Sequence, residues 1–481
     1  MVKRIVFCIF AIVISIANVS AKSKTISPLD FGLEKARTGI DRYNALLRCH
    51  QEAAKKGLSV SYRGIGRLEI EIPEEGISIP LPNYTDFFGV EMIVKTTGKA
   101  KFLFAMSKQT KRVMVTGDEI DGGDFRRNPS LKTGKYLLVV SDETLWVKNR
   151  KGYDYGATRR DVFYIKNGRS NERPISSYRT EMSKPAAVYC AVSSDKKVVK
   201  NLKILRASDS PVKVFCIQIN NQYNVELSNI TITTPEDEHN FGDAAIQILN
   251  CVSVTMNDIK INGTYSQKGR YGYGVNADNV NGLIVNRMSA RAKWGVFGTN
   301  NMSNVRLKDC SINRFDIHCY GRDVAFNNCN FVGLYNQFSS IYGKIIFKKC
   351  SFSDFIPVLI ESSYNAYTPF ELIWKDCIFY LDKKHNYLMT LFGVPEGYNE
   401  RHELRRKSLP NITIKNCKVA ILENMDNWVL IKTDGLYYKE PFDNITDINI
   451  KNLKTEGGKN ANLKLYSEDI KTSEQVNVRI R

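Results

Sequence analysis

The strongest constraint on the fold is a short motif that recurs from about residue 198 almost to the end of the 481-residue chain. Each copy is a run rich in Val, Ile and Phe, followed by a polar residue, often Asn or Asp, and then by a small or apolar residue. Successive copies end 19 to 40 residues apart. A variable period with a minimum of about 20 residues is typical of a solenoid in which some turns carry insertions. The copies end at Leu202, Ile230, Ile259, Met288, Cys310, Cys329, Cys350, Cys377, Cys417 and Leu453.

Five of the eleven Cys residues end successive copies of this motif, at Cys310, Cys329, Cys350, Cys377 and Cys417. In a solenoid, stacked coils place like residues on like, so these side chains would form a buried internal ladder. Cys is among the most readily buried residue types and packs as a small hydrophobe. The spacing also lacks the Cys-x-x-Cys pattern of metal and redox sites. We therefore predict free thiols that serve packing.

The start of the chain indicates export. Residues 1–21 hold Lys3 and Arg4, an apolar run, and a small-residue end, which is the pattern of a secretory signal peptide. We expect a secreted or periplasmic protein of a bacterial cell envelope. No later stretch is long and apolar enough for a membrane span.

The rest of the chain divides into three parts. Residues 22–115 are predicted to form an N-terminal cap and the first coils, with a helix from Asp41 to Lys56 that covers the end of the solenoid. Residues 116–197 are predicted to be early coils with basic insertions, and a small inserted β domain is the alternative. Residues 198–481 are predicted to be regular coils.

The charge balance indicates an anionic partner. The formal net charge is +19, and residues 101–200 alone hold 21 Lys and Arg against 11 Asp and Glu. For an exported chain without a nucleic-acid-binding motif, the favoured partner is an acidic polysaccharide rather than nucleic acid. A basic surface that serves solubility alone is the competing interpretation. We expect a monomer.

One repeat carries an unusual set of reactive side chains. Residues 314–320 alternate strictly, and a strand of period two places alternate side chains on opposite faces. The apolar face holds Phe315, Ile317 and Cys319. The polar face, which we predict to be solvent-facing and catalytic, holds Arg314, Asp316, His318 and Tyr320.

Aligning a second strand in neighbouring coils extends this candidate site. The predicted inward row stacks Ile217, Ile246, Val275, Val296 and Ile317, and it makes Tyr273 and Trp294 core aromatics. Small outward residues such as Gly274 and Gly295 then leave a trough that leads to Asp316. The candidate substrate-binding residues are Lys293, Asn276, Gln247, Arg270, Tyr271 and Arg322.

At this point a family resemblance can be stated. The start Leu29-Asp30-Phe31-Gly32 followed by a helix, together with the Asn/Asp-Cys coils, resembles right-handed parallel β-helix proteins of the pectin-lyase-like superfamily. The resemblance covers most of the mature chain, and the layout is similar to that of secreted bacterial polysaccharide lyases, including enzymes that act on glycosaminoglycans. It implies an all-β right-handed parallel β-helix with an N-terminal helix cap and long loop insertions. No catalytic motif of the family matches residue by residue.

The residues of the polar face suit β-elimination on a uronate-containing polysaccharide. That reaction needs a cation on the carboxylate, a base for the neighbouring C–H proton, and an acid for the leaving oxygen. Arg314 and Lys293 are the candidate cations, and His318 is the candidate base because its pKa is ordinarily near neutrality. Tyr320 is the candidate acid, and Asp316 would orient His318.

Two alternatives remain open from the sequence. A glycoside hydrolase would use a pair of carboxylates, Asp316 with Asp278, and Asp243 in reserve. A non-catalytic glycan-binding solenoid fits the repeat and the charge equally well. We expect no cofactor, although the three Asp residues of the hydrolase alternative are also of the type that binds Ca²⁺. His385 is predicted to be a loop residue rather than a metal ligand.

Overall fold

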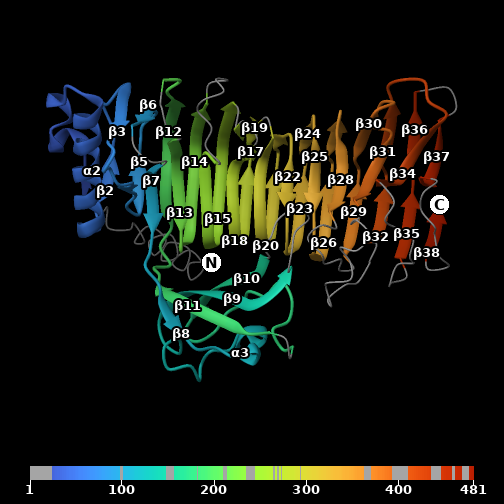
Figure 1. Cartoon of the computed structure of the whole chain (residues 1–481), viewed down its shortest axis with the longest axis horizontal. Coiled ribbons are helices and arrows are strands. Elements are labelled where there is room, and N and C mark those ends of the chain that lie inside the picture. The colour runs from blue at the N-terminus through green and yellow to red at the C-terminus, as the bar shows by residue number, and fades with distance from the viewer. Residues whose placement is uncertain are drawn as a thin grey trace, which may run out of the picture.

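The structure is a computed structural model, in which residues 1–23, with the predicted signal peptide, lie outside the part that is described. It shows one elongated body with a smaller domain against its middle (Figure 1). Within the described part, no helix is long and apolar enough to cross a membrane. The described residues are 24–97, 101–147, 157–180, 183–209, 214–234, 244–263, 266–267, 270–271, 273–292, 294–361, 370–392, 410–434, 446–457, 461–467 and 476–480.

The elongated body is a parallel β-helix, as predicted. Its strands form a 32-stranded sheet in which each strand pairs in parallel with strands of the neighbouring coils. Three rows of strands make up the faces. The first row contains β1 (Thr25–Ile26), β2 (Ser59–Ser61), β5 (Tyr84–Asp86), β12 (Lys197–Arg206), β14 (Tyr223–Thr233), β15 (Ile246–Gly263), β18 (Tyr273–Asn286), β20 (Gly295–Lys308), β23 (Gly321–Asn327), β26 (Ile341–Lys348), β29 (Glu371–Lys375), β32 (Asn411–Lys415), β35 (Thr446–Lys451) and β38 (Val476–Ile480).

The second row, which we call the site face, lies beside the first. Because β15, β18 and β20 are long and bend, their first residues belong to the site face and their later residues to the first row. The other strands of the site face are β4 (Ile79–Pro80), β7 (Lys101–Ser107), β13 (Val214–Asn220), β22 (Phe315–Ile317), β25 (Tyr335–Phe338), β28 (Ile356–Glu361), β31 (Tyr387–Phe392), β34 (Asn427–Asp434) and β37 (Asn462–Tyr466).

The third row closes the coil, and the ends of β12, β14 and β15 contribute to it. Side chains from the inward sides of the three rows fill one continuous apolar core. The other strands of the third row are β3 (Leu68–Ile72), β6 (Glu91–Thr96), β19 (Ser289–Ala292), β21 (Ser311–Ile312), β24 (Asn330–Val332), β27 (Ser351–Ser353), β30 (Ile378–Leu381), β33 (Lys418–Ile421) and β36 (Lys454–Glu456).

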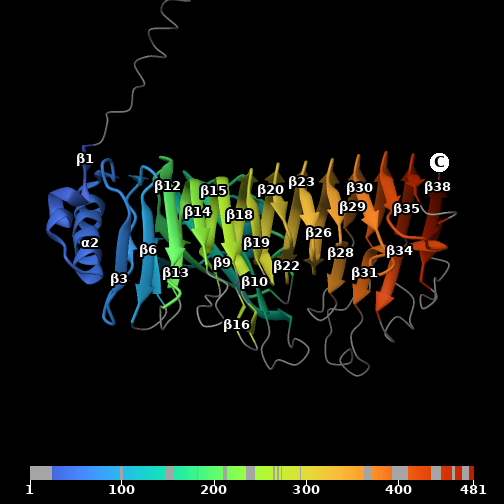
Figure 2. The ribbon, with the colours of Figure 1, turned by 90° about the horizontal axis from the view of Figure 1, so that it is seen from above.

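A helix covers the N-terminal end of this core, which confirms the predicted cap (Figure 2). The chain reaches it through two short 3-10 helices, η1 (Pro28–Phe31) and η2 (Leu33–Lys35). The helix α2 (Gly39–Lys56) begins two residues before its predicted start at Asp41. Thr38 is the N-cap, and Asp41 completes a capping box by accepting from the Thr38 N–H.

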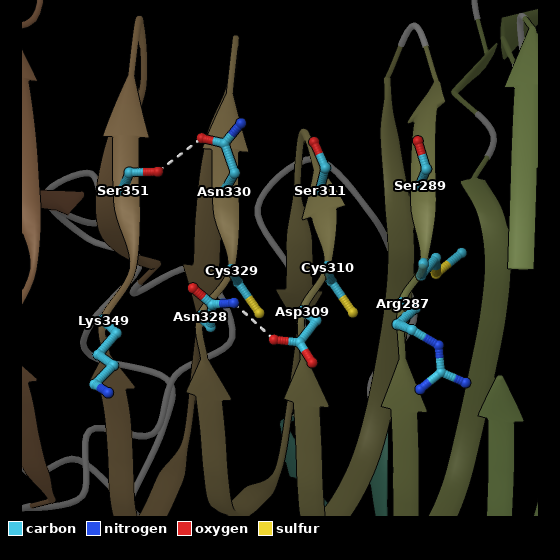
Figure 3. A pocket seen from close by; sticks show the side chains of 11 residues that line it. Arg287, Ser289, Asp309, Cys310, Ser311, Asn328, Cys329, Asn330, Lys349 and Ser351 are labelled. Carbon is cyan, nitrogen blue, oxygen red and sulfur yellow. Dashed lines mark hydrogen bonds between the residues drawn. The ribbon is translucent and has the colours of Figure 1, made fainter. Parts of the chain in front are cut away.

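The polar residue of the repeated motif has a specific backbone role. It adopts the left-handed conformation at the bend between the first and third rows, with φ between 51° and 61° in the ten copies. Asn and Asp tolerate this conformation better than most residues. Figure 3 shows this bend from close by, with Asn328 donating to Asp309 over 2.7 Å. The ten residues are Asn201, Asn229, Asp258, Arg287, Asp309, Asn328, Lys349, Asp376, Asn416 and Asn452.

The Cys ladder is confirmed. All five side chains are buried and the thiols are free. The Cys329 thiol lies 3.6 Å from the Leu307 carbonyl of the preceding coil and 3.5 Å from the Asn327 carbonyl. The thiols therefore seal the bend between two rows by packing and by weak hydrogen bonds to the backbone.

The predicted early coils between residues 116 and 197 are not coils of the solenoid. This region forms a four-stranded antiparallel sheet with its own apolar core, which we call the inserted domain. The solenoid continues directly from β7 to β12, since β12 pairs with β5 and β6. The alternative of a small inserted β domain describes the region. Its elements are β8 (Lys111–Val113), α3 (Gly117–Gly122), β9 (Lys135–Val147), β10 (Ala157–Lys166) and β11 (Pro185–Ala191).

The inserted domain lies against the middle coils of the solenoid, at the bend between the site face and the first row (Figure 1). Strand β10 crosses successive coils there. Tyr164 stacks on Tyr223 with ring centroids 3.8 Å apart. On a later coil of the solenoid, Asn301 Oδ1 accepts from the backbone N–H of Arg160 over 2.9 Å. The inserted domain thus borders the same coils that carry the candidate site.

Candidate functional site

The candidate site lies on the outward side of the site face, where a row of polar side chains ends at a buried carboxylate. The observed register stacks Gln218 on Gln247, and Gln247 on Asn276. Asn276 pairs with Gly298, which pairs with Asp316, and Asp316 pairs with Gln337. The row that leads to Asp316 therefore contains Gln247 and Asn276, which are both half-buried. It is not the predicted trough of small residues such as Gly274 and Gly295, because Gly298 is the residue that pairs with Asp316.

The predicted register is wrong in two coils. After Val275 the row continues with Phe297 and Phe315, whereas the prediction continued it with Val296 and Ile317. The first error reverses the faces of one coil, so that Phe297 is buried in the core. Trp294, predicted as core, instead lies over the outer face beside Arg314. The cause is a change in coil length, which sequence spacing alone does not locate within the coil.

The prediction of a solvent-facing Arg314 and Asp316 is also wrong, although both point outward. Their side chains are 2% and 0% exposed, and Arg314 Nε lies 2.6 Å from Asp316 Oδ2. The guanidinium carbon lies 4.2 Å from the Trp294 ring centroid and 4.1 Å from that of Tyr335. Arg314 also donates to Gln337 Oε1 over 3.0 Å. Aromatic rings therefore cover this ion pair on the outside of the coil.

Two proton-carrying side chains meet the same carboxylate. The Tyr273 hydroxyl donates to Asp316 Oδ2 over 2.8 Å and lies 2.9 Å from His318 Nε2. His318 Nε2 is itself 3.5 Å from Asp316 Oδ2, and 17% of the His318 side chain is exposed. Arg314, Asp316 and His318 therefore do lie together, as the alternation predicts, and His318 is the member that reaches the surface.

The charges at this cluster are set by burial and by the ion pair. Burial alone would raise the pKa of Asp316, but the charge of Arg314 and hydrogen bonding with His318 and Arg314 more than offset it, so the pKa is lowered. Burial and the Asp316 charge raise the pKa of Tyr273 well above its usual value. Tyr273 therefore stays protonated and donates a hydrogen bond to the ionised carboxylate of Asp316. The hydrogen bond between Tyr273 and His318 then needs a proton on Nε2 of His318.

Two glycines explain how this cluster fits. A Cβ on Gly298 would lie 2.2 Å from the Tyr273 ring, and one on Gly295 would lie 2.8 Å from Arg314 Cδ. The predicted trough residue Gly295 thus makes room for the Arg314 side chain, and Gly298 makes room for the ring of Tyr273. Tyr273 is the important residue that the sequence prediction assigned to the core. Gly298, which faces the Tyr273 ring, is the feature of the sequence that could have indicated this position of Tyr273.

Tyr320 does not belong to this cluster. It lies at the bend next to the inserted domain with φ 60°, where earlier coils place Asn279 and Asn301. Its ring is 1% exposed and packs in a cluster with Ile175 and Cys319. The strict alternation that predicted its position ends after β22, because the strand ends at Ile317 and the chain turns.

The other predicted binding residues have separate positions. Arg322 donates to the Pro174 carbonyl over 2.6 Å and so attaches the inserted domain. Arg270 and Tyr271 form β17 (Arg270–Tyr271), which pairs with β16 (Ser266–Gln267), but their side chains are outside the described part. Lys293 also lies outside the described residues.

The carboxylates of the hydrolase alternative are held apart in different ion pairs. Asp278 accepts from Arg160 Nη1 over 2.9 Å and from Asn301 Nδ2 over 3.0 Å. Burial raises the pKa of Asp278, and Arg160 partly offsets this. Asp243 lies outside the described residues. Elsewhere in the described part, Asp354, Asp382 and His385 place possible ligand atoms within 4.8 Å of one another, on coils beyond the site.

The comparisons with known proteins agree with the fold. No family model matches the sequence, and no curated protein matches it significantly. Among solved structures, the tailspike protein gp49 from Pseudomonas phage LKA1 matches with a TM-score of 0.53 and 13% identity, over 92% of this chain and 82% of that one. The gp54 tailspike of Acinetobacter baumannii bacteriophage AP22, solved with a capsular saccharide, matches with a TM-score of 0.50 and 12% identity, over 95% and 79%. At these identities the likeness concerns the parallel β-helix fold.

Proposed function

We propose that this chain is an exported enzyme that cleaves an acidic, uronate-containing polysaccharide by β-elimination. The observation that carries the proposal is the contact of Tyr273 with both Asp316 and His318. It joins an ionised carboxylate, a protonated phenol and a partly exposed imidazole on the outward side of the site face. The net charge of +19 supports an anionic substrate. The saccharide bound by the AP22 tailspike shows that this fold can hold a glycan.

His318, Asp316 and Arg314 have separate roles in this reaction. With the Nε2 proton of His318 held by Tyr273, the imidazole accepts the proton of the carbon next to the uronate carboxylate at Nδ1. The electron pair of that C–H bond forms the C=C bond, and the C–O bond to the leaving sugar breaks. The imidazolium then returns the proton to the leaving oxygen. Asp316 stabilises the imidazolium while it exists, and Arg314 keeps Asp316 ionised.

Arg314 is not the cation that neutralises the substrate, because it is covered and engaged with Asp316 and Gln337. Lys293 keeps its proposed role at the carboxylate of the reacting sugar. The acid role first assigned to Tyr320 passes to His318 itself. No metal ion is needed in this scheme.

A hydrolase is the second candidate, and one observation favours it. The pKa of Asp278 is raised while that of Asp316 is lowered, and two carboxylates with divergent pKa values suit acid and base roles. Against it, Asp316 is fully buried beneath Arg314 and Tyr273, so it does not reach a substrate. We therefore favour the lyase.

The deciding experiment incubates the full chain with chondroitin sulfate, hyaluronan, heparin, alginate and pectate. We expect ultraviolet absorbance from an unsaturated uronate product with at least one of them. New reducing ends without that absorbance would establish the hydrolase instead. Retention on a polyanion column without any cleavage would leave a glycan-binding solenoid.

A further inference from the structure

The inserted domain brings one cation to the candidate site that the sequence does not place there. Arg160 lies on β10, yet its guanidinium reaches Asp278 on the solenoid, 118 positions further along the chain. Of the Arg160 side chain, 42% remains exposed, against 2% for Arg314. Arg160 is therefore an accessible arginine where Arg314 is not.

The strand register places Arg160 beside the row that ends at His318. Asp278 pairs with Asn300 on the next coil. Because Thr299 pairs with Ile317, Asn300 is followed on the next coil by His318. Adjacent coils are about 4.8 Å apart, so the Asp278 and His318 backbones are separated by about 10 Å. A glycan that lies over His318 along the solenoid passes the Arg160–Asp278 pair.

Backbone contacts, and not the guanidinium alone, fix the position of Arg160 on the solenoid. Its backbone N–H donates to Asn301 Oδ1, and the neighbouring Asp161 carbonyl accepts from Asn279 Nδ2 over 3.4 Å. The strand is thus fixed on the coils by its backbone. Asp278 holds one end of the guanidinium through Nη1, while a planar arginine fork offers five N–H donors in all.

We propose that Arg160 of the inserted domain is a specificity residue that binds an acidic group on a sugar next to the one at His318. This inference rests on the proposed function, because it takes a uronate polymer as the ligand of the site face. An arginine fork suits a carboxylate, and every uronate unit of such a polymer carries one. Asp278 keeps the fork extended before substrate binds, and it rejects a misplaced anion by its own charge.

The experiment measures binding without turnover, in the His318→Ala background. Affinity electrophoresis ranks the five acidic polysaccharides, and the tightest binder is then used as the probe together with its carboxyl-reduced form. We expect Arg160→Gln to weaken binding of the acidic probe by about tenfold. Arg126→Gln is the matched control, since Arg126 is also an exposed arginine of the inserted domain and pairs with Asp124. It should change binding less than twofold.

A second variant separates recognition from the effect of an unpaired Asp278. Arg160→Gln with Asp278→Asn removes both charges, and we expect it to bind the acidic probe as weakly as Arg160→Gln. Recovery of wild-type affinity in the double variant would show that Asp278 repulsion caused the loss, and would overturn the inference. So would equal losses on the carboxyl-reduced probe, or no binding of any of the five polymers.

The two proposals fail in different ways. Cleavage by the wild-type chain with unchanged affinity in Arg160→Gln rejects the role of Arg160 and leaves the lyase. Weakened binding in Arg160→Gln, with no cleavage of any polymer by the wild type, rejects the lyase and leaves Arg160 as a glycan-binding residue.

Discussion

Two buried Arg–Asp pairs, one in each part of the molecule, show how similar contacts serve different ends. In the inserted domain, Arg159 Nη2 lies 2.9 Å from Asp142 Oδ2, and the side chains are 1% and 0% exposed. On the solenoid, Arg314 and Asp316 are equally buried. Each guanidinium also lies against an aromatic ring, that of Tyr178 in the first case, at 4.0 Å.

The pairs differ in what else they contact. Arg159 also donates to Ser176, to Ser183 and to the Ser177 carbonyl, while Asp142 accepts from the Lys184 N–H. These partners are hydroxyls and backbone groups that keep their protons near neutral pH.

Asp316 instead accepts from Tyr273 and lies beside His318, and His318 is partly exposed. The Arg159–Asp142 pair therefore holds loops together. The Arg314–Asp316 pair instead sets the charge beside a histidine that can exchange a proton. Burial of a charged pair alone does not distinguish structural from functional roles.

The sharpest test of this difference is His318→Ala. If His318 is the proton acceptor, cleavage should fall by about 10²–10⁴-fold, which is the usual contribution of a general base. The melting temperature should stay close to that of the wild type, since the side chain is partly exposed and outside the core. Rates come from the ultraviolet assay and folding from circular dichroism. Full activity in the variant would remove His318 from the mechanism.

The next test removes the acid from each pair in turn. Asp142→Ala and Asp316→Ala each leave a buried guanidinium without its carboxylate, and each should lower the free energy of unfolding by about 3–5 kcal/mol. Only Asp316→Ala should also abolish cleavage in protein that is still folded. Urea denaturation gives the stability, and activity is measured well below the unfolding midpoint. Equal loss of activity in both variants would contradict the division of roles.

The fold was predictable because a solenoid repeats one local rule. The polar residue before Cys310 or Cys329 marks a left-handed bend, and an apolar run with a small residue marks an inward strand. Because the motif recurs in ten copies, an unclear residue in one copy does not obscure the prediction of the fold. The inserted domain, by contrast, has no repeat, and its strand β11 pairs with β8 and β9 rather than with β10, its neighbour in the sequence.

The site was only partly predictable because it depends on coil length. Alternation brought Arg314, Asp316 and His318 to one side, as the strand period requires. The sequence did not reveal that rings from other coils, such as that of Trp294, cover the ion pair. It also could not show that Tyr273 reaches Asp316, 43 positions away, because that contact follows from the register and from Gly298.

A third test concerns pH and the inserted domain. Burial raises the pKa of Asp161 to about 7, partly offset by the Ile175 N–H and by the charges of Arg159 and Arg322. The ordinary value is about 3.9, so between these values the folded chain binds a proton that the unfolded chain lacks. This contribution to stability is complete below about pH 4 and is lost as the pH rises through about 7.

From pH 5 to pH 8 we therefore expect the wild type to lose about 2–3 kcal/mol of unfolding free energy through this group. Asp161→Asn, which mimics the protonated acid, should show a flatter profile and exceed the wild type at pH 8. Urea denaturation at both pH values measures this. Parallel profiles of the two proteins would mean that Asp161 is ionised in the fold.

The smallest effect is expected from Tyr273→Phe, which tests the role of a single hydroxyl group. The ring still fits over Gly298, but the hydroxyl that bonds Asp316 and His318 is lost. A hydrogen bond to a charged group contributes about 1.5–3 kcal/mol, and part of it should appear as a cleavage rate about tenfold lower. Tyr136→Phe, in the inserted domain, is the matched control and should leave the rate unchanged. If Tyr273 only fills space, both variants would cleave at the wild-type rate, and the site would reduce to a buried ion pair with a histidine beside it.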